Sequence, residues 1–435
     1  MIKVCKFGGS SVASSAQFKK IKKIVDADKT RKIIVASACG KDNKDDYKVT
    51  DLLYLCDAHN KYGMSYDDIL ELIRKKHQEI IDNLHLDFNL ETEILSIKEI
   101  LKKKDNLDEL VSRGEYISCR LLAQYLGADF VDAKDVITFN YDGTVNLIKT
   151  KEKFTYYMNT KNKIVVPGFY GALENGVIKT FSRGGSDITG SLLANIVDAS
   201  VYENWTDVSG IYVCDPRIIK DPKKIDIITY NELREMSYMG ASVLHDEATF
   251  PVKDKKIPIN IRNTNKPDDA GTLIVDSTED VRNIITGITG KKGFLVVSVT
   301  KSNSSSEVGY LKKVLTIFEN YNVPIVMNST GVDSFSITVE KKDIKNNIYN
   351  IASEIKSKTG AEEVTVSDDL ALVCVVGRGM KAKKGMSGKI FSTLGKNNIN
   401  IKTISQGANE ISIIVGVSEE DFNNTIECMY KEFIK

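Results

Sequence analysis

The first residues of the chain combine a lysine, two glycines and two serines at the end of a short apolar run. The segment Lys6-Phe7-Gly8-Gly9-Ser10-Ser11 follows residues 2–5 directly. Glycines let backbone N–H groups approach an anion without a Cβ in the way, and a lysine beside them is suited to a phosphate. A helical pattern over residues 16–26 would point its N-terminus at the same anion. The segment predicts a phosphate-binding loop, or else an ordinary turn between a strand and a helix.

A second glycine pair lies in Phe181-Ser182-Arg183-Gly184-Gly185-Ser186-Asp187. It follows a strand-like run at residues 177–180 and precedes a helical pattern at 188–197, so Ser186 or Asp187 is suited to cap that helix. An arginine beside bare backbone donors offers a planar fork for a carboxylate or a phosphate. The alternative is a capped turn with a solvated arginine.

A third stretch carries hydroxyl, carboxylate, aromatic and guanidinium groups after an apolar strand. It consists of Trp205-Thr206-Asp207-Val208-Ser209-Gly210-Ile211-Tyr212, followed by Cys214-Asp215-Pro216-Arg217. Judged alone, it is compatible with a nucleotide pocket or with a turn-rich crossover.

Taken together, the three segments resemble the aspartokinase family. Ser112-Arg113-Gly114-Glu115 resembles that family's glutamate-bearing helix start, and Pro167-Gly168-Phe169 resembles its aromatic substrate loop. The resemblance covers essentially the whole chain. It implies ATP-dependent phosphorylation of the β-carboxylate of L-aspartate, the first step of lysine, threonine and methionine biosynthesis, with ATP and Mg²⁺ as cofactors.

The resemblance also implies roles for individual residues. Lys6 is expected to contact the γ-phosphoryl group, with backbone donors from Gly8, Gly9 and Ser10. Asp187 is expected to orient Lys6 or to help hold magnesium. On the aspartate side, Arg183 would bind the α-carboxylate, Glu115 would pair with the ammonium, and Ser37, Thr50, Phe169 and Ser186 match the remaining positions. On the nucleotide side, the matching positions are Thr206, Asp207, Tyr212 and Arg217.

The implied chemistry needs no strong base. A carboxylate nucleophile is already ionised near neutral pH, and no site motif contains a histidine. Catalysis then consists of bringing two anions together and screening the charge of the transferred group.

One segment departs from the family pattern. In Met239-Gly240-Ala241-Ser242-Val243-Leu244-His245-Asp246, the family has a lysine at the position of Ser242 and a proline at that of Asp246. The lysine is a nucleotide contact in the family, so its loss predicts weaker ATP binding unless Lys253 or Lys255 replaces it. His245 is expected to satisfy a local backbone group.

Composition limits the function classes. The chain has 435 residues and a net charge of +1, which gives no overall field for nucleic acid or for an anionic membrane. No run approaches the ~20 apolar residues of a membrane-spanning helix. Seven cysteines without a C-x-x-C pair indicate reduced thiols and a cytoplasmic protein. The four histidines lack metal-ligand spacing, so no metal held by the protein alone is expected.

Apolar strands and helical patterns alternate over the first two thirds of the chain. This predicts an α/β domain over residues 1–280, a mainly parallel sheet sandwiched by helices, with a helical lobe at about 64–112. The resemblance identifies it as an amino-acid kinase fold. Strands are expected at residues 2–7, 32–37, 128–132, 164–169, 200–204 and 259–262.

The last third contains an internal repeat with an offset of 76 residues. Asn322-Val323-Pro324-Ile325 recurs as Asn398-Ile399-Asn400-Ile401, and Gly309 recurs as Gly385. Each copy is predicted as strand, helix, strand, strand, helix. The copies resemble tandem ACT domains, ferredoxin-like βαββαβ modules. The first module is expected at 294–366 and the second at 283–290 plus 369–435, so that the first is inserted within the second.

The ACT resemblance implies regulation by an end-product amino acid. Lysine is favoured and threonine remains possible, with Met327, Asp333, Gln406 and Asn409 as effector residues. A homodimer or larger assembly is expected to form through the ACT modules. Two rivals stay open: another acylphosphate-forming kinase of the same fold, such as a glutamate kinase, and a catalytically idle amino-acid sensor.

Overall fold

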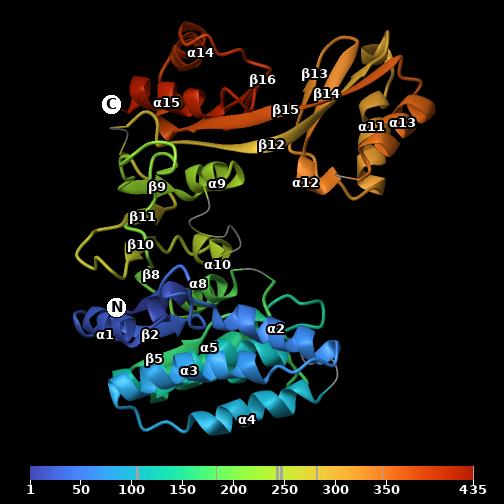
Figure 1. Ribbon diagram of the computed structural model, residues 1–435. Coiled ribbons are helices and arrows are strands. Elements are labelled where there is room, and N and C mark those ends of the chain that lie inside the picture. Colours follow the sequence, from blue (N-terminus) through green and yellow to red (C-terminus); the bar gives the residue numbers. More distant parts are fainter. Residues whose placement is uncertain are drawn as a thin grey trace. The chain divides into compact units, whose positions relative to one another are not determined.

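A computed structural model describes residues 1–103, 107–182, 184–241, 244, 248–280, 283–344 and 346–434. The chain forms two compact units, which are described separately (Figure 1). Unit 1 comprises Met1–Ile211, Asp226–Tyr230 and Val243–Thr278. Unit 2 comprises Tyr212–Ile225, Asn231–Ser242 and Glu279–Lys435.

Unit 1 is built on an eight-stranded sheet in the order β3-β5-β2-β1-β8-β10-β11-β9. All its pairings are parallel except that of β10 with β11, which is antiparallel. The strands are β1 (Lys3–Phe7), β2 (Arg31–Ala36), β3 (Asp129–Phe130), β5 (Ile164–Pro167), β8 (Val201–Thr206), β9 (Ile227–Thr229), β10 (Ile259–Asn263) and β11 (Thr272–Val275).

Helices cover this sheet because its central strands are apolar on both faces. Four of the five residues of β1 and all four of β5 are buried. Helix α8 (Gly185–Ile196) packs against β1, β2 and β8, and α5 (Leu107–Leu126) packs against β5. Helix α1 (Ser15–Asp26) buries Phe18, Ile21, Ile24 and Val25. The predicted mainly parallel sheet covered by helices is confirmed.

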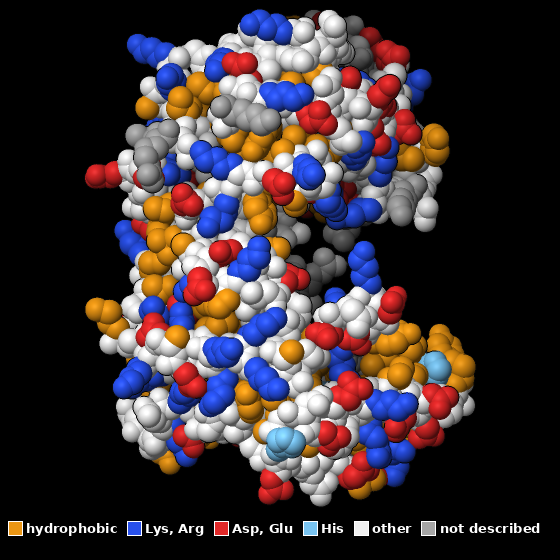
Figure 2. All heavy atoms as spheres, turned by 60° about the vertical axis from the view of Figure 1, so that its left-hand side comes forward, with side chains coloured by type: hydrophobic (Ala, Val, Ile, Leu, Met, Phe, Trp, Pro, Cys, Tyr) orange, Lys and Arg blue, Asp and Glu red, His pale blue; other side chains and the backbone are white. Residues whose placement is uncertain are grey.

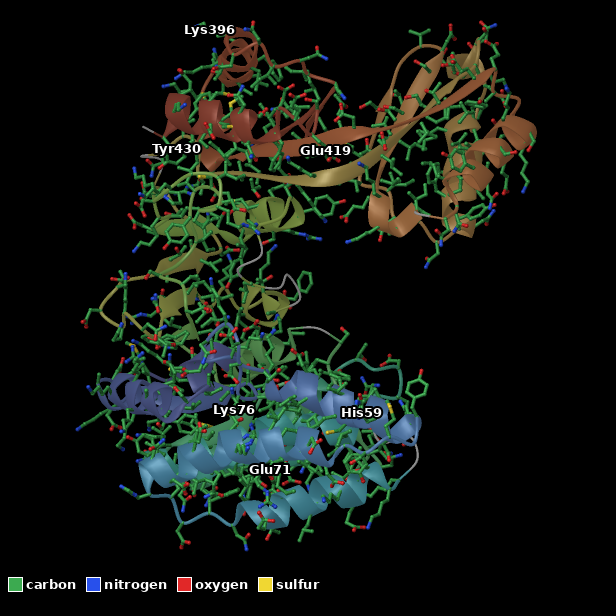
Figure 3. All side chains as sticks on the ribbon, in the orientation of Figure 1. His59, Glu71, Lys76, Lys396, Glu419 and Tyr430 are labelled. Carbon is green, nitrogen blue, oxygen red and sulfur yellow. The ribbon has the colours of Figure 1, made fainter. Side chains whose placement is uncertain are left out.

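A helical lobe extends from the sheet (Figure 1). It consists of α2 (Val49–Lys61), α3 (Asp67–Leu84) and α4 (Leu90–Leu101), packed on one another and on α5. Figure 3 labels His59, Glu71 and Lys76 on it; Lys76 pairs with Asp46 and so fixes the loop before α2. Unit 1 also holds α6 (Ala133–Val136), α7 (Leu147–Thr160), α10 (Phe250–Lys253) and a small sheet of β4 (Thr138–Phe139), β6 (Tyr170–Leu173) and β7 (Ile178–Thr180).

Unit 2 contains a six-stranded antiparallel sheet in the order β13-β14-β12-β15-β17-β16. Its two long central strands run side by side in Figure 1. The strands are β12 (Gly287–Thr300), β13 (Met327–Thr330), β14 (Ser334–Glu340), β15 (Glu363–Val376), β16 (Thr403–Gln406) and β17 (Ser412–Val417). The helices are α9 (Tyr230–Tyr238, whose first residue belongs to unit 1), α11 (Tyr310–Asn320), α12 (Lys341–Ile344), α13 (Ile348–Thr359), α14 (Met386–Lys396) and α15 (Phe422–Phe433).

The sequence repeat is visible in the backbone. Helix α14 begins and ends 76 residues after α11, and β16 lies 76 residues after β13. Gly309 and Gly385 precede the two helices with φ of 78° and 86°, and Asn322 and Asn398 follow them with φ of 53° and 55°. Glycine and asparagine tolerate this left-handed region, which explains why both residue types recur.

Strand β12 serves both copies of the repeat. Its second half, from Phe294, pairs with β14 and with the first half of β15. Its first half, Gly287 to Lys292, pairs with the end of β15 from Ala371 to Val376. The side chain of Glu419, labelled in Figure 3, accepts hydrogen bonds from Lys341 of the first copy (2.9 Å) and from the Gly293 amide in mid-β12 (3.2 Å).

In the view of Figure 2, basic and acidic side chains are interspersed. Among the described residues, no helix is long and apolar enough to span a membrane.

Candidate active site

The carboxyl ends of four neighbouring strands bring the candidate residues of unit 1 together. Lys6 on β1 lies opposite Val35 on β2 and Asn204 on β8, and Val35 lies opposite Val166 on β5. The loops that leave these strands therefore meet at one edge of the sheet. Ligands of α/β proteins bind at this edge.

Lys6 and Asp187 form the centre of this edge. The Lys6 Nζ lies 2.6 Å from Asp187 Oδ1, and Lys6 is buried. The Asn204 amide donates to the same oxygen over 2.9 Å. Helix α8 begins at Gly185, and its N-cap is Gly184, with φ of 60° and no side-chain cap. The prediction that Ser186 or Asp187 caps the helix is therefore wrong: both lie in the first turn, because glycine supplies the left-handed residue before it.

The first glycine pair is used partly for packing. The Gly8 amide donates to the Trp205 carbonyl over 3.0 Å, so the predicted Gly8 donor is already engaged. Gly9 lies so close to the neighbouring loop that a Cβ on it would come within 3.1 Å of the Ala38 carbonyl oxygen. No backbone acceptor for the Gly9 and Ser10 amides occurs in the described part of the chain. These two amides are the donors that remain for an anion.

Glu115 presents a buried carboxyl group for which the described residues supply no counter-ion. It lies on α5 with 4% of its surface exposed, and its Oε2 has no hydrogen-bond partner among the described residues. Burial raises the pKa of Glu115 to about 8. The hydrogen bond from the Ala38 backbone acts in the opposite direction and is the weaker effect. Gly114 allows this close approach, since a Cβ there would lie 2.8 Å from Ala38 Cβ. An unpaired buried carboxyl group is suited to receive a cation.

Ser37 and Thr50 adjoin Ala38 and Val49, two of the residues that pack on Gly114 next to Glu115. The Ser37 amide donates to the Phe7 carbonyl (3.1 Å), directly after β2. Helix α2 starts where Val49 donates to the Cys39 carbonyl (3.0 Å), which places Thr50 in its first turn.

Phe169 and Ser186 are brought together on the other side of β2. The Phe169 backbone has φ of 78°, and its amide bonds to the Thr189 hydroxyl of α8 over 3.2 Å. A Cβ at Gly168 would lie 2.5 Å from the Ser186 hydroxyl, so glycine is required there. This strained turn fixes the aromatic ring beside the first turn of α8.

Four of the residues singled out in the sequence lie outside the described residues: Arg183, Ser242, His245 and Asp246. The expected replacement of the lysine missing at 242 by Lys255 is not supported. The Lys255 ammonium binds the Asn195 carbonyl (2.7 Å) and Asp198 (2.6 Å), at the end of α8 opposite Asp187.

The predicted nucleotide residues divide between the two units. Thr206 and Asp207 lie at the end of β8, where the Thr206 hydroxyl donates to Asp207 over 3.1 Å. Tyr212 and Arg217 belong to unit 2. There Arg217 is 86% exposed and pairs with Asp215 at 2.6 Å. The sequence placed the four residues in one pocket, and neither unit by itself contains all four.

The effector candidates lie in unit 2, near strands β13 and β16. Met327 is buried on β13. The Asp333 carboxylate accepts the Asn303 amide over 2.8 Å, so one of its oxygens is occupied. Gln406 and Asn409 are exposed at and after the end of β16. The two strands approach each other, with the Ser329 and Thr403 hydroxyls 3.3 Å apart.

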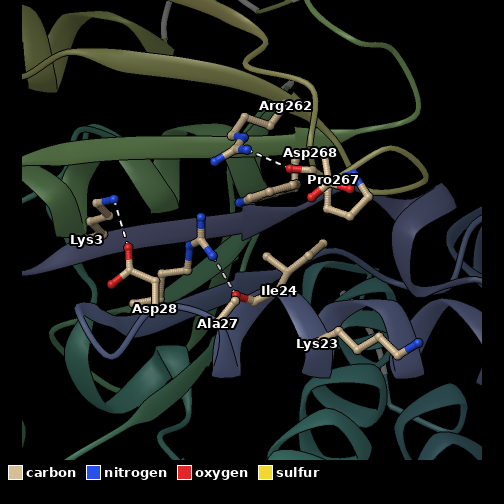
Figure 4. A pocket seen from close by; sticks show the side chains of 10 residues that line it. Lys3, Lys23, Ile24, Ala27, Asp28, Arg262, Pro267 and Asp268 are labelled. Carbon is tan, nitrogen blue, oxygen red and sulfur yellow. Dashed lines mark hydrogen bonds and ion pairs between the residues drawn. The ribbon is translucent and has the colours of Figure 1, made fainter.

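A hollow of about 510 Å³ lies on the face of the sheet opposite Lys6 (Figure 4). Three of the four cations that line it, Lys3, Arg31 and Arg262, form ion pairs. Arg31 forms an ion pair with buried Glu203 at 2.7 Å and donates to the Ile24 carbonyl, and Lys3 pairs with Asp28 at 2.9 Å. The Arg31 and Arg262 guanidinium groups both lie over the Trp205 ring. The cluster stabilises the sheet beneath the site.

Comparisons with known proteins agree with this geometry. The profile of the Amino acid kinase family matches residues 1–263, and an ACT domain profile matches residues 373–433. Aspartokinase 3 of Bacillus subtilis is 34% identical over 447 residues, which cover 99% of this chain and 98% of that protein. The chain belongs to the aspartokinase family. As an aspartokinase, it is an aspartate kinase enzyme with an amino-acid kinase fold followed by an ACT region.

Two solved aspartokinases resemble it over their full lengths. The aspartate kinase of Clostridium acetobutylicum is 47% identical, with a TM-score of 0.94 over 99% of this chain and 100% of that one. Aspartokinase III of E. coli, solved in complex with aspartate and ADP, is 25% identical, with a TM-score of 0.78 over 100% of both chains. The same E. coli enzyme, solved in complex with lysine and aspartate, is 26% identical with the same TM-score.

One polar residue of this aspartokinase site was missed from the sequence. Asn204 is buried on a central strand and contacts the Asp187 carboxylate, yet it matches no motif residue used above. The signal that identifies it is its position: it is a buried polar residue directly opposite Lys6.

Proposed function

We propose that the chain transfers the γ-phosphoryl group of ATP to the β-carboxylate of L-aspartate, giving 4-phospho-L-aspartate. In this proposal it is a cytoplasmic enzyme that performs the first step of lysine, threonine and methionine biosynthesis. The observation that carries the proposal is the buried Glu115 carboxyl group, whose Oε2 has no partner among the described residues. The ammonium group of an amino acid is a cation of the right size for it, and a glutamate side chain without a charged partner there would be costly.

The residues around Glu115 fit the rest of this substrate. Phe169 and Ser186 lie on the far side of β2, within the same strand-end edge, and are proposed to hold the remaining polar groups of aspartate together with Ser37, Thr50 and Arg183. The aspartate β-carboxylate is ionised near neutral pH and attacks phosphorus without a base. Lys6 then neutralises charge on the transferred group, with the Gly9 and Ser10 amides as further donors.

The donor set at this edge suits magnesium only in combination with a nucleotide. In the described part of the chain, no three histidine, cysteine or acidic side chains form a metal cluster. Magnesium usually keeps several waters and is bound by one or two carboxylates together with substrate phosphates. Asp187 and Asp207 are the carboxylates that would hold it. When bound, it would offset the negative charge of the phosphates.

The ACT region is proposed to carry feedback regulation. E. coli aspartokinase III has been crystallised with lysine, and we infer that lysine, or alternatively threonine, binds here near β13 and β16. The proposed modules are residues 294–366 and residues 283–290 plus 369–435, after a kinase domain of residues 1–280. Assembly as a homodimer or larger oligomer through these modules belongs to the same proposal.

The test is an assay with ATP, Mg²⁺ and L-aspartate in which the acylphosphate is trapped as its hydroxamate. We expect hydroxamate to form with aspartate and not with glutamate, and its rate to fall when lysine is added. Product from glutamate alone would favour the other acylphosphate-forming kinases. No product from either amino acid, with lysine still bound, would favour an idle sensor.

A further inference from the structure

Asn204 occupies an unusual position for its residue type. It lies on β8, which pairs with β1 on one side and β10 on the other, and it is 4% exposed. Asparagine is depleted in strands, and a buried amide must find hydrogen-bond partners. The residue opposite it on β10 is Ile261, whose side chain offers no hydrogen-bond partner. Among the described residues, Asp187 is the one side-chain partner of this amide, and the contact accounts for an asparagine at this position.

Strand β8 holds Asp187 at two points. The Asn204 amide donates to its carboxylate oxygen Oδ1 (2.9 Å), and the Tyr202 hydroxyl donates to its backbone carbonyl (3.1 Å). Helix α8 comes close enough for this because Gly190 faces the tyrosine ring, where a Cβ would lie 2.7 Å from a ring carbon. The backbone contact positions the helix, and the amide contact positions the carboxylate.

The two side-chain contacts of the carboxylate fall on the same oxygen. Lys6 Nζ lies 2.6 Å from Oδ1, which also accepts the Asn204 amide. With only the lysine present, the carboxylate is free to rotate about its terminal bond, because such torsions are broad. A second donor fixed on a strand removes that freedom. The amide is neutral, so it restricts the carboxylate without competing with Lys6 for its charge.

We propose that Asn204 is a positioning residue for phosphoryl transfer, acting through Asp187 to fix the ammonium of Lys6. It is not assigned a contact with substrate. The inference rests on the proposed function of the site, in which Lys6 meets the transferred phosphoryl group. Side-chain positioning of this kind typically accounts for about 10- to 100-fold in activity.

The experiment compares Asn204→Leu with Tyr202→Phe in the full-length enzyme. Asn204→Leu keeps the number and branching of the side-chain heavy atoms and removes the amide donor. Tyr202→Phe removes only the hydroxyl that binds the Asp187 backbone, and so serves as the matched control. We expect kcat for aspartate phosphorylation to fall about 10- to 100-fold in Asn204→Leu with KM for aspartate within about twofold, and kcat of Tyr202→Phe to stay within about threefold.

A second variant covers the case in which Asn204→Leu does not fold. Asn204→Asp keeps the shape of the side chain but replaces the amide donor by a carboxylate, which accepts hydrogen bonds and cannot donate to Asp187 Oδ1. We expect its kcat to fall at least about 10-fold, with KM for aspartate within about twofold.

The outcomes separate this inference from the proposed function. A wild-type enzyme that does not phosphorylate aspartate would overturn both. An active wild type whose kcat is unchanged in Asn204→Leu, or reduced equally in Tyr202→Phe, would overturn the positioning role alone. A wild-type kcat in Asn204→Asp would do the same.

Discussion

Replacing Glu115 by glutamine is expected to make the ligand-free enzyme more stable and to weaken aspartate binding. Burial raises the pKa of Glu115 to about 8 from an ordinary value of 4.5. At neutral pH the folded protein therefore holds this carboxyl group mostly protonated, whereas the unfolded chain holds it ionised. At a pH above the ordinary pKa of this group, folding therefore requires the carboxylate to bind a proton. This requirement lowers the free energy of unfolding. Glutamine is neutral at every pH and has no such requirement.

The size of the effect follows from the two pKa values. Between these two pKa values, the contribution of Glu115 lowers the free energy of unfolding by about 1.4 kcal/mol for each unit by which the pH rises. This contribution stops changing above the folded-state pKa. The carboxyl group therefore costs about 3 kcal/mol at pH 7 and about 1 kcal/mol at pH 5. We expect Glu115→Gln to be more stable than wild type by about these amounts. The gain should thus be larger at pH 7 than at pH 5.

Urea unfolding measured at both pH values is the assay. Trp205, the single tryptophan, is buried in unit 1, so its fluorescence reports the unit that contains Glu115. A gain of the same size at both pH values would refute the reasoning, because the benefit would then not come from ionisation. A loss of stability at pH 7 would refute it as well.

Aspartate binding provides a second readout of the same group. If the substrate ammonium pairs with Glu115, the carboxyl group ionises on binding and releases about 0.9 proton at pH 7. Calorimetry in two buffers of different ionisation enthalpy measures this number. In Glu115→Gln we expect no release and a dissociation constant raised about 30-fold or more, since a buried charge pair is lost. Proton release that persists in the variant would assign it to another group.

Three further outcomes are expected. Lys6→Met should abolish hydroxamate formation while aspartate binding, measured by calorimetry, stays within about threefold, and strong residual turnover would remove Lys6 from phosphoryl transfer. Glu203→Ala should lower the free energy of unfolding by about 3 to 5 kcal/mol, because it leaves Arg31 buried without its partner. The control Asp26→Asn, which removes an exposed ion pair, should lower it by less than about 1 kcal/mol in the same urea titration. Gly168→Ala should raise KM for aspartate, because the added Cβ would lie 2.5 Å from the Ser186 hydroxyl and 2.7 Å from the Ser186 Cα, so that the start of α8 must shift; an unchanged KM would show that Ser186 does not meet the substrate.

The central strands of unit 1 could be predicted from the sequence to within about two residues. Strands β1, β2, β5 and β8 are buried over most of their length, and their apolar residues mark them in the sequence. The strands that were not predicted, β4, β6, β9 and β11, are two to four residues long. Strands of that length are specified by their partners rather than by their own pattern.

The repeat was predictable for a different reason. Its signal came from glycines and asparagines that recur at fixed offsets, and the structure shows that they recur because Gly309, Gly385, Asn322 and Asn398 all adopt positive φ. Residue type was constrained by backbone geometry at these points, so the pattern survived where apolar residues diverged.

The candidate site was predictable as a set of residues but not as an arrangement. The resemblance led to the expectation that Asp187 orients Lys6 or helps to hold magnesium, and the fold adds the ion pair between them and its distance of 2.6 Å. Burial of Glu115 and the resulting rise of its pKa depend on how α5 packs in the folded unit, which no local pattern encodes. Asn204 became visible only through the register of β8 against β1. The assignment of Tyr212 and Arg217 to unit 2 likewise depends on long-range contacts.

The shared strand β12 has a consequence for how the regulatory half can be rebuilt. Lys292 lies directly opposite Ala371 in the antiparallel pairing of β12 with β15. The chain between them, residues 293–370, therefore leaves and re-enters the sheet at neighbouring points, as tolerated insertions generally do. Joining the two positions by a two-residue turn would convert the shared strands into a simple β-hairpin. The second copy of the repeat would then be one uninterrupted segment, available without the first.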